Sequence, residues 1–447
     1  MRTRNLVVCA IGLVTLAACS SPPKPAAPRP PVASPSASAS AAPVDTSTGH
    51  IDFHNWQSTS DWAAGSRKAT VASAAGLTLS ARAAGTISYH DPHKKKTGTW
   101  AYGTWTSPSH SIGFGATELV SSWNAITPAG TWIEVQLLGT YADGTSTPAY
   151  IMGRWASGDG DIFRASVDNQ NDDNSQINTD TFLINDGSDA RLVSYRLKVT
   201  LYRKPGQNAG PVVREVGAFA SGLPQRSTVA VSNGPASQHP AWGVELKVPA
   251  FSQNIHKGQY DQYDGGGEAW CSATSTAMVV DYWKKAPSAQ QAAWVNPSYK
   301  DPQVDVSARS VFDYQYDGTG NWPFNAAYAA SYGLNAIVTQ IRSVDDAEAL
   351  IAAGIPIVAA VAFKSYELDG ANYSTEGHLL VIVGFTKTGD VITNDPASNG
   401  DAAVRNVYKR DQFAQVWLRT TNGSSGGVAY LIKPPSKAWP KVAGATW

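Results

Sequence analysis

One cysteine and one histidine in the second half of the chain are residue types that serve as nucleophile and base. Cys271 lies in the stretch GGEAWCSATSTAMVVDYW (266–283), and His378 follows Gly377 and opens the apolar run HLLVIVGF. A thiolate attacks carbonyl carbon, and an imidazole takes the thiol proton and later returns it to the leaving group. The pair predicts a nucleophilic sulfur with an imidazole partner. His256, in a Gly-, Gln- and Tyr-rich segment, is predicted to be a surface histidine instead.

The thiol is predicted to lie at the start of a helix. Small and apolar residues recur at spacings of three and four from Ala273 to Tyr282, directly after the glycines 265–267. Backbone N–H groups at a helix start stabilise a thiolate, and with a cationic neighbour such cysteines reach a pKa of about 3.5 to 7.5. We therefore expect a reactive thiol, the alternative being an inert buried cysteine.

The imidazole and a carboxylate are predicted to meet across a β-hairpin. The runs 378–385 and 390–395 have the pattern of two strands joined by a four-residue loop. That loop makes His378 the diagonal neighbour of Asp395, with Cα atoms about 7–8 Å apart. Any even-numbered loop keeps the two on one face, whereas an odd-numbered loop would bring Asn394 round instead. We expect Asp395 to orient the imidazole and keep Asn394 as the alternative.

Four motifs follow one another in the last two fifths of the chain. In order they are Val248-Pro249 with Ser252-Gln253, Trp270-Cys271 with the Thr/Ser-rich helix to Tyr282, Gly377-His378 with its apolar strand, and Asn394-Asp395-Pro396. Together they resemble the papain-like cysteine peptidases of the bacteriocin-processing, double-glycine-leader type, over about residues 247–435. The resemblance implies an α+β papain-like domain with Cys271 as nucleophile, His378 as general base and acid, Asp395 as the residue that orients the imidazole, and Gln253 as an oxyanion-hole donor.

The chain departs from this family in two places. Ser272-Ala273 follow the cysteine, where many relatives have a glycine, and a long insertion separates Gln253 from Cys271. The insertion must loop out if Gln253 is to reach the sulfur. Gln259 and Gln262 therefore compete for the same role.

The N-terminus has the features of an export signal. It combines arginines with a short apolar run, and Leu16-Ala17-Ala18-Cys19 resembles the bacterial lipoprotein box. We expect residues 1–19 to be a lipoprotein signal with lipid attached to Cys19, the alternative being an ordinary signal peptide cut nearby. Residues 20–50, nearly all Pro, Ala and Ser, are expected to be a disordered tether. The protein is then anchored on the extracellular face of the cell membrane, or otherwise secreted.

The cysteine count and the charge narrow the classes of function. Cys9 leaves with the signal and Cys19 carries lipid, so that Cys271 has no disulfide partner in its own chain. Lys plus Arg and Asp plus Glu number 35 each, which argues against a nucleic-acid-binding surface. No later segment has the length and apolarity of a membrane span, and no pattern predicts a metal or an organic cofactor.

The segment 51–246 is predicted to be an all-β antiparallel sandwich of jelly-roll type. Apolar and polar residues alternate over 133–137 and 195–201, and Asp143-Gly144 is a hairpin signal. In 247–447 helical patterns are followed by apolar strand patterns, as in an α+β fold.

Two features of the β segment have competing interpretations. Its tryptophans could bind polysaccharide by stacking, but we expect core residues: Trp56, Trp62, Trp100, Trp105, Trp123, Trp132, Trp155 and Trp242. The acidic stretch 168–180 lacks the ligand spacing of a calcium loop and predicts a solvated loop.

These observations predict an envelope-anchored extracellular cysteine hydrolase that cleaves peptide or amide bonds through a thioester. Leader processing is not expected, because that activity belongs to domains of cytoplasm-facing transporters. One alternative is a cell-wall endopeptidase or amidase, although such enzymes usually have an Asp-Cys-Ser-Gly context around the cysteine. The other is a noncatalytic surface lipoprotein that binds carbohydrate or peptide and carries a degenerate peptidase domain.

Overall fold

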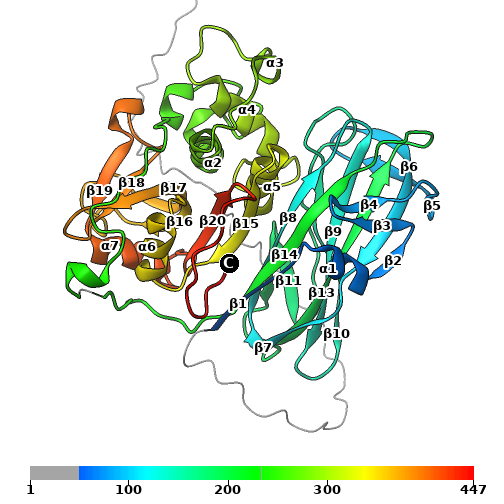
Figure 1. Ribbon diagram of the computed structural model, residues 1–447, viewed down its shortest axis with the longest axis horizontal. Helices are drawn as coiled ribbons and strands as arrows, with labels where there is room; N and C mark the ends of the chain where they lie inside the picture. Colours follow the sequence, from blue (N-terminus) through cyan, green and yellow to red (C-terminus); the bar gives the residue numbers. More distant parts are fainter. Residues whose placement is uncertain (1–49, 233) are drawn as a thin grey trace, which may run out of the picture.

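The computed structural model describes residues 50–232 and 234–447, and antiparallel sheets dominate it (Figure 1). The predicted signal 1–19 with Cys19, and the predicted tether 20–50 apart from its last residue, lie outside the described residues. Among the described residues, no helix combines the length and the apolar character needed to cross a membrane.

Fourteen strands and one helix make up residues 50–222. Their bounds are β1 (His50–Trp56), α1 (Thr59–Ala64), β2 (Ser66–Lys68), β3 (Thr70–Ser73), β4 (Gly76–Leu79), β5 (Gly85–Asp91), β6 (Lys96–Thr106), β7 (His110–Ala116), β8 (Glu118–Ile126), β9 (Thr131–Tyr141), β10 (Ser146–Trp155), β11 (Ser175–Asn178), β12 (Thr181–Ile184), β13 (Leu192–Arg203) and β14 (Val212–Gly222). One seven-stranded sheet has the order β11-β12-β8-β14-β4-β3, with β1 also paired to β14. The other has the order β10-β9-β13-β6-β2, with β5 on β6 and β7 on β13.

The strands predicted from alternation are confirmed. Strand β9 contains 133–137, strand β13 contains 195–201, and the two pair with each other in antiparallel register. The turn at Asp143-Gly144 joins β9 to β10, where Gly144 has a φ of +85°, which glycine adopts without steric cost. Local sequence pattern therefore sufficed for these elements.

The acidic stretch 168–180 is more ordered than predicted. Its residues 175–178 form strand β11, and the Asp172 carboxylate accepts hydrogen bonds from the backbone N–H groups of Asn174 and Ser175 and from the Tyr141 hydroxyl. The expectation of a solvated loop is wrong for residues 175–178, which form a strand. Residues 168–174 form a loop, in which carboxylate-to-backbone bonds fix the turn.

The tryptophans of the two sheets are core residues. Trp62 and Trp105, for example, pack edge to face with ring centroids 5.0 Å apart. Seven of the eight are at most 4% exposed: Trp56, Trp62, Trp100, Trp105, Trp123, Trp132 and Trp155. The core interpretation is thus confirmed for these seven, whose ring faces are not presented to a polysaccharide. Trp242 is partly buried in the segment that leads to the C-terminal part.

Helices precede most of the strands in the C-terminal part. The elements are η1 (Ala236–Gln238), η2 (Gln253–His256), η3 (Gly267–Ala269), α2 (Cys271–Tyr282), α3 (Ala289–Ala292), α4 (Pro302–Val311), α5 (Trp322–Ser331), β15 (Asn335–Gln340), α6 (Val344–Ala352), β16 (Ile357–Phe363), β17 (Thr375–Phe385), β18 (Val391–Asn394), η4 (Asp401–Ala403), β19 (Arg405–Tyr408), α7 (Arg410–Leu418) and β20 (Val428–Lys433). The strands form one antiparallel sheet in the order β15-β20-β16-β17-β18-β19. The predicted helix at Cys271 and the predicted strands of the hairpin are present.

Both faces of this six-stranded sheet are covered. Leu379 and Val381 of β17 belong to the buried cluster that contains helix α2, whereas Leu380 and Ile382 belong to the cluster that contains α6 and α7. Because successive side chains of a strand point to opposite faces, a continuous apolar run fits a strand buried on both sides.

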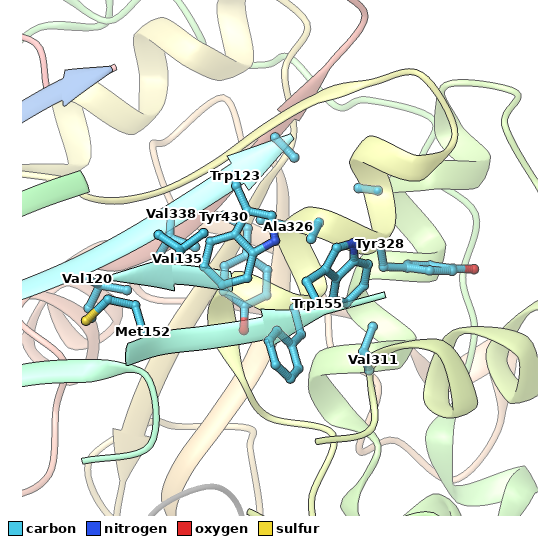
Figure 2. Close-up of a cluster of buried hydrophobic side chains, with 14 of the residues drawn as sticks. Val120, Trp123, Val135, Met152, Trp155, Val311, Ala326, Tyr328, Val338 and Tyr430 are labelled. Atoms are coloured by element: carbon cyan, nitrogen blue, oxygen red, sulfur yellow. The ribbon is translucent and has the colours of Figure 1, made fainter. Parts of the chain in front are cut away.

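The N-terminal sheets and the C-terminal part share one core. Helix α5 packs on strand β8, and the Phe324 ring lies 6.2 Å from that of Trp123 and 5.4 Å from that of Trp155, measured between centroids. Figure 2 shows Trp123 and Trp155 in one buried cluster with Ala326 and Tyr328 of α5. The backbone N–H of Ala336 also donates to Asn124 Oδ1 at 2.9 Å. The two parts are therefore held against each other by buried contacts.

Candidate active site

The thiol lies where the sequence predicts it, on the first residue of helix α2. Trp270 is the N-cap, and its side chain does not cap the helix but donates its indole N–H to the Tyr263 carbonyl oxygen at 2.6 Å. The first-turn N–H groups of a helix have no intrahelical acceptor, so the positive end of the helix dipole faces Cys271. Cys271 is 1% exposed.

The imidazole of His378 is held between a carboxylate and the thiol. Its Nε2 lies 2.8 Å from Asp395 Oδ1, and both side chains are buried. Nδ1 is the ring nitrogen that remains for Cys271, with which His378 is also hydrogen-bonded. Burial opposes the charged ring, but the attraction of Asp395 and then that of Cys271 outweigh it and raise the pKa of His378 to about 10. This environment favours an imidazolium beside a thiolate.

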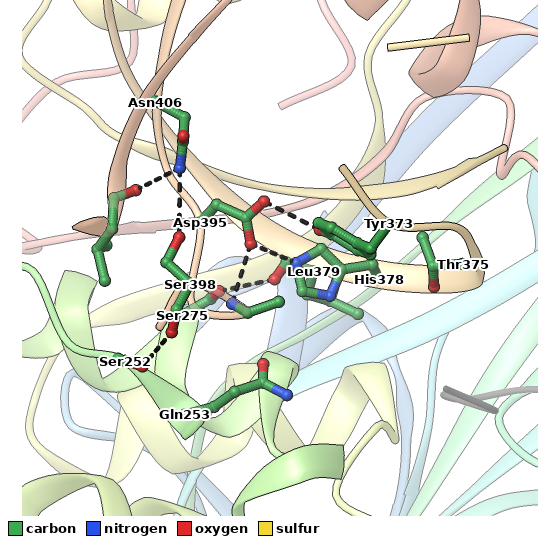
Figure 3. A network of polar contacts seen from close by, with 12 residues as sticks. Ser252, Gln253, Ser275, Tyr373, Thr375, His378, Leu379, Asp395, Ser398 and Asn406 are labelled. Atoms are coloured by element: carbon green, nitrogen blue, oxygen red, sulfur yellow. Dashed lines mark hydrogen bonds and ion pairs between the residues drawn. The ribbon is translucent and has the colours of Figure 1, made fainter. Parts of the chain in front are cut away.

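Asp395 accepts four hydrogen bonds. Oδ1 accepts from His378 and from the backbone N–H of Ala397 at 3.0 Å, while Oδ2 accepts from the Tyr373 hydroxyl at 2.9 Å and the Tyr408 hydroxyl at 3.1 Å. Figure 3 shows Asp395 between His378 and Tyr373. Burial alone would raise the pKa of this carboxyl, but His378 and the other donors hold it below its usual value. The carboxylate is thereby fixed in position and in its charged form.

The hairpin has the predicted register near His378, but its loop length and its strand pairing differ from the prediction. Phe385 pairs with Val391, so the loop has five residues, 386–390, and the prediction of a four-residue loop is wrong. A register shift at Val383 inserts one extra residue into β17 and restores the predicted face. The shift occurs where the backbone N–H of Leu246 donates to the Val383 carbonyl at 2.8 Å. The register shift that brings Asp395 to His378 therefore coincides with a contact from a segment distant in sequence.

Asn394, the alternative partner of the imidazole, has another role. Its side-chain amide donates to the backbone carbonyls of Val248 at 3.2 Å and Pro249 at 3.1 Å. These bonds fix the segment that leads to Gln253. Asp395, not Asn394, contacts the His378 ring.

Gln253 lies between the carboxylate loop and the approach to the thiol. Its backbone N–H donates to the Pro396 carbonyl at 2.9 Å, and its side-chain Nε2 donates to the Glu268 carbonyl at 2.6 Å, three residues before Cys271. Gln253 is 2% exposed. The insertion loops out as required, since Gly267 returns so close to Gln253 that a Cβ there would lie 2.3 Å from the Gln253 carbonyl oxygen. An amide nitrogen carries two hydrogens, so a second donor is left on Gln253.

The competing glutamines are used elsewhere. Gln259 bonds within its own loop, to His256 and to the Ile255 carbonyl, and Gln262 is exposed.

The prediction that His256 lies on the surface is wrong: it is 0% exposed, with Nδ1 3.4 Å from Asp305 Oδ2. The sequence pattern of the loop does not reveal this, because helix α4 supplies the carboxylate.

Three residues at the site have no signature in the sequence. Tyr373 and Tyr408 reach Asp395 from the segment before β17 and from β19, and no spacing rule joins them to it. Asp264 lies close enough to Cys271 to interact electrostatically. Burial, and to a smaller extent Cys271, raises the pKa of Asp264 to about 7, although the hydrogen bonds from Thr319 lower it. Only tertiary structure brings these groups to the thiol.

A cavity lies beside the imidazole. It has a volume of about 140 Å³ and is lined by residues that include Trp322, Glu376, His378 and Ser425. His378 therefore borders a space that a small part of a substrate can enter.

Comparison with known proteins relates both halves of the chain to one peptidase group. Residues 52–221 match the family described as peptidase C39 N-terminal domain, and residues 245–425 match the peptidase C39 like family. No curated protein and no solved structure matches the chain. The second match contains Cys271, His378 and Asp395. The chain thus carries a peptidase C39 N-terminal domain followed by a peptidase C39-like domain.

Proposed function

We propose that the chain is a cysteine hydrolase that cleaves peptide or amide bonds through a Cys-His-Asp triad, on a papain-like α+β domain preceded by a β-sandwich. One observation carries the proposal: the His378 ring is bonded through Nε2 to Asp395 and is also hydrogen-bonded to Cys271. A nucleophile, a base and an orienting group in that order are what thiol-based acyl transfer requires.

The first half of the reaction forms a thioester. The Cys271 proton resides on His378, and the thiolate attacks the carbonyl carbon of the scissile bond, forming the S–C bond as the carbonyl electron pair moves to oxygen. When this pair returns, the C–N bond breaks, and His378 gives its proton to the leaving amine. Asp395 stabilises the imidazolium and holds its tautomer throughout.

The second half returns the enzyme to its starting state. Neutral His378 takes a proton from water, the hydroxide attacks the thioester carbonyl, and the C–S bond breaks to release the acid product and the thiolate. In both halves the oxyanion forms near the start of helix α2. We assign its stabilisation to the backbone N–H of Cys271 and the second amide hydrogen of Gln253.

We propose that this reaction takes place outside the cell. Cys19 would carry the lipid, and residues 20–50 would hold the folded part away from the membrane, which makes peptides or wall components of the cell envelope the accessible substrates.

The test is hydrolysis of a peptide library by the purified protein and by its Cys271→Ala variant. We expect turnover by the wild type and none by the variant, with the circular dichroism spectrum of the wild type retained by the variant as evidence that the fold is kept. Intact cell wall supplied as a second substrate separates peptide hydrolysis from wall digestion. Equal hydrolysis by the two proteins would refute the assignment of Cys271.

A further inference from the structure

A second cavity lies between the N-terminal sheets and the C-terminal part. It has a volume of about 300 Å³ and is walled by the start of β8, the β11–β12 turn, Gln340 and residues 424–426. Trp322 and Ser425 line both this cavity and the smaller one beside His378. The two cavities are therefore neighbours that share a wall, and strand β8 lies beside helix α5 at this junction (Figure 1).

This interdomain cavity is lined by two carboxyl groups without a compensating cation. Glu118, the first residue of β8, and Asp180, in the β11–β12 turn, line it. Within the described part of the chain, its lining includes no Lys, Arg or His. Burial raises the pKa of each carboxyl to about 7, and for Glu118 the charge of Asp180 adds to the rise. An ammonium or guanidinium ion between them would stabilise both in the charged form.

A buried acceptor in the same wall also lacks a donor. Gln340 is 0% exposed, its Nε2 donates to the Ser425 carbonyl at 3.0 Å, and its Oε1 has no hydrogen-bond partner. Buried polar atoms of native proteins are nearly always satisfied, so an orphaned oxygen at a cavity indicates a missing donor. Lysine and arginine side chains carry donors only.

We infer that the interdomain cavity is a substrate subsite that binds a lysine or arginine side chain of the peptide cleaved at Cys271. The inference rests on the proposed function and adds its substrate class. Glu118 and Asp180 would contact the cationic group, and Gln340 would accept from it.

The N-terminal domain then takes part directly in substrate selection. Asp180 Oδ2 accepts a hydrogen bond from the backbone N–H of Trp322 at 2.6 Å. The carboxylate that would contact the cation is thus bonded to the residue that borders the cavity at His378. An extended peptide passing Trp322 would bring its scissile bond and its cationic side chain to the two cavities at once.

The test compares matched peptides on the full-length protein. The internally quenched peptides differ at a single position, which holds Lys, Arg, norleucine or Glu, and each position is varied in turn. The kcat/KM of every peptide is measured with the wild type, Glu118→Gln and Asp180→Asn. At one position we expect kcat/KM for the Lys and Arg peptides to be about ten- to hundredfold higher than for the norleucine peptide, which is the range typical of hydrogen bonds to charged groups. Each variant is expected to reduce that ratio toward one. Asp189→Asn is the matched control, because Asp189 is an exposed acid of the same domain outside the cavity.

A binding measurement separates this inference from the proposed function. Fluorescence anisotropy of the same labelled peptides with the Cys271→Ala protein, with and without Glu118→Gln, needs no turnover. If the Lys peptide binds more tightly than the norleucine peptide, and Glu118→Gln removes this difference, the subsite is supported even if no peptide is cleaved. Cleavage without any preference for Lys or Arg at any position would overturn the subsite and leave the hydrolase intact. The subsite would also be overturned if millimolar calcium competed with peptide binding while the peptides showed no preference for lysine.

Discussion

Replacing Asp395 by asparagine removes one negative charge and keeps the shape of the side chain. The asparagine oxygen can still accept from His378 Nε2, and its amide can donate to the hydroxyls of Tyr373 and Tyr408. The main loss is the electrostatic stabilisation of the imidazolium. The substitution therefore isolates the charge of the triad.

The size of the effect follows from the pKa of His378. That pKa rises from 6.5 to about 10, and Asp395 is the largest of the causes that raise it, ahead of Cys271. The carboxylate is therefore the main cause of the rise. We expect the alkaline limb of the kcat/KM profile to move to lower pH by about two units, since the ring loses its proton more easily without the anion.

The assay is kcat/KM from pH 5 to pH 11 with one quenched peptide. The wild type is expected to lose activity as the pH rises through about 10, and the Asp395→Asn variant as it rises through about 8. Near pH 10 the variant is therefore expected to be roughly a hundredfold slower than the wild type. Asp390→Asn, in the loop of the same hairpin, is the matched control and should keep the wild-type profile. An alkaline limb that does not move in Asp395→Asn would refute the role of Asp395.

Three further predictions concern the surroundings of the triad. Gln253→Ala is expected to lower kcat by about a hundred- to a thousandfold, whereas Gln259→Ala leaves it near the wild-type value; equal effects in steady-state kinetics would contradict the oxyanion role. Tyr373→Phe removes one donor that holds the pKa of Asp395 low, so the acid limb of the activity profile should move to higher pH while Tyr408 still donates; an unmoved limb would count against that bond. Phe324→Ala is expected to cost about 3–5 kcal/mol of unfolding free energy within a single calorimetric transition, because the two parts share a core; separate transitions would contradict this.

The positions of Cys271, His378 and Asp395 could be predicted because each residue lies beside a strong local signal. Cys271 follows a run of glycines and begins a helix, His378 follows a glycine at the start of an apolar strand, and Asp395 precedes a proline at the end of another. Each signal fixes the local backbone and so the place of the side chain along its element.

The register of the hairpin could not be derived in the same way. The five-residue loop alone would have turned Asn394 toward the imidazole, and only the register shift at Val383 corrects this. That shift coincides with a hydrogen bond from Leu246, which lies far away in the sequence. The burial of His256 was missed for the same reason, since its partner Asp305 lies on helix α4. Tertiary contacts overrode the local pattern in both cases.

The most direct test of the central claim is the pH dependence of Cys271 alkylation by iodoacetamide in the folded protein, read by peptide mass mapping. A thiolate paired with His378 should react at pH 6, well below the ordinary thiol pKa of about 8.5, and His378→Ala should remove that reactivity. Labelling of Cys271 only above pH 8, or only after unfolding, would contradict the ion pair and the hydrolase proposed from it.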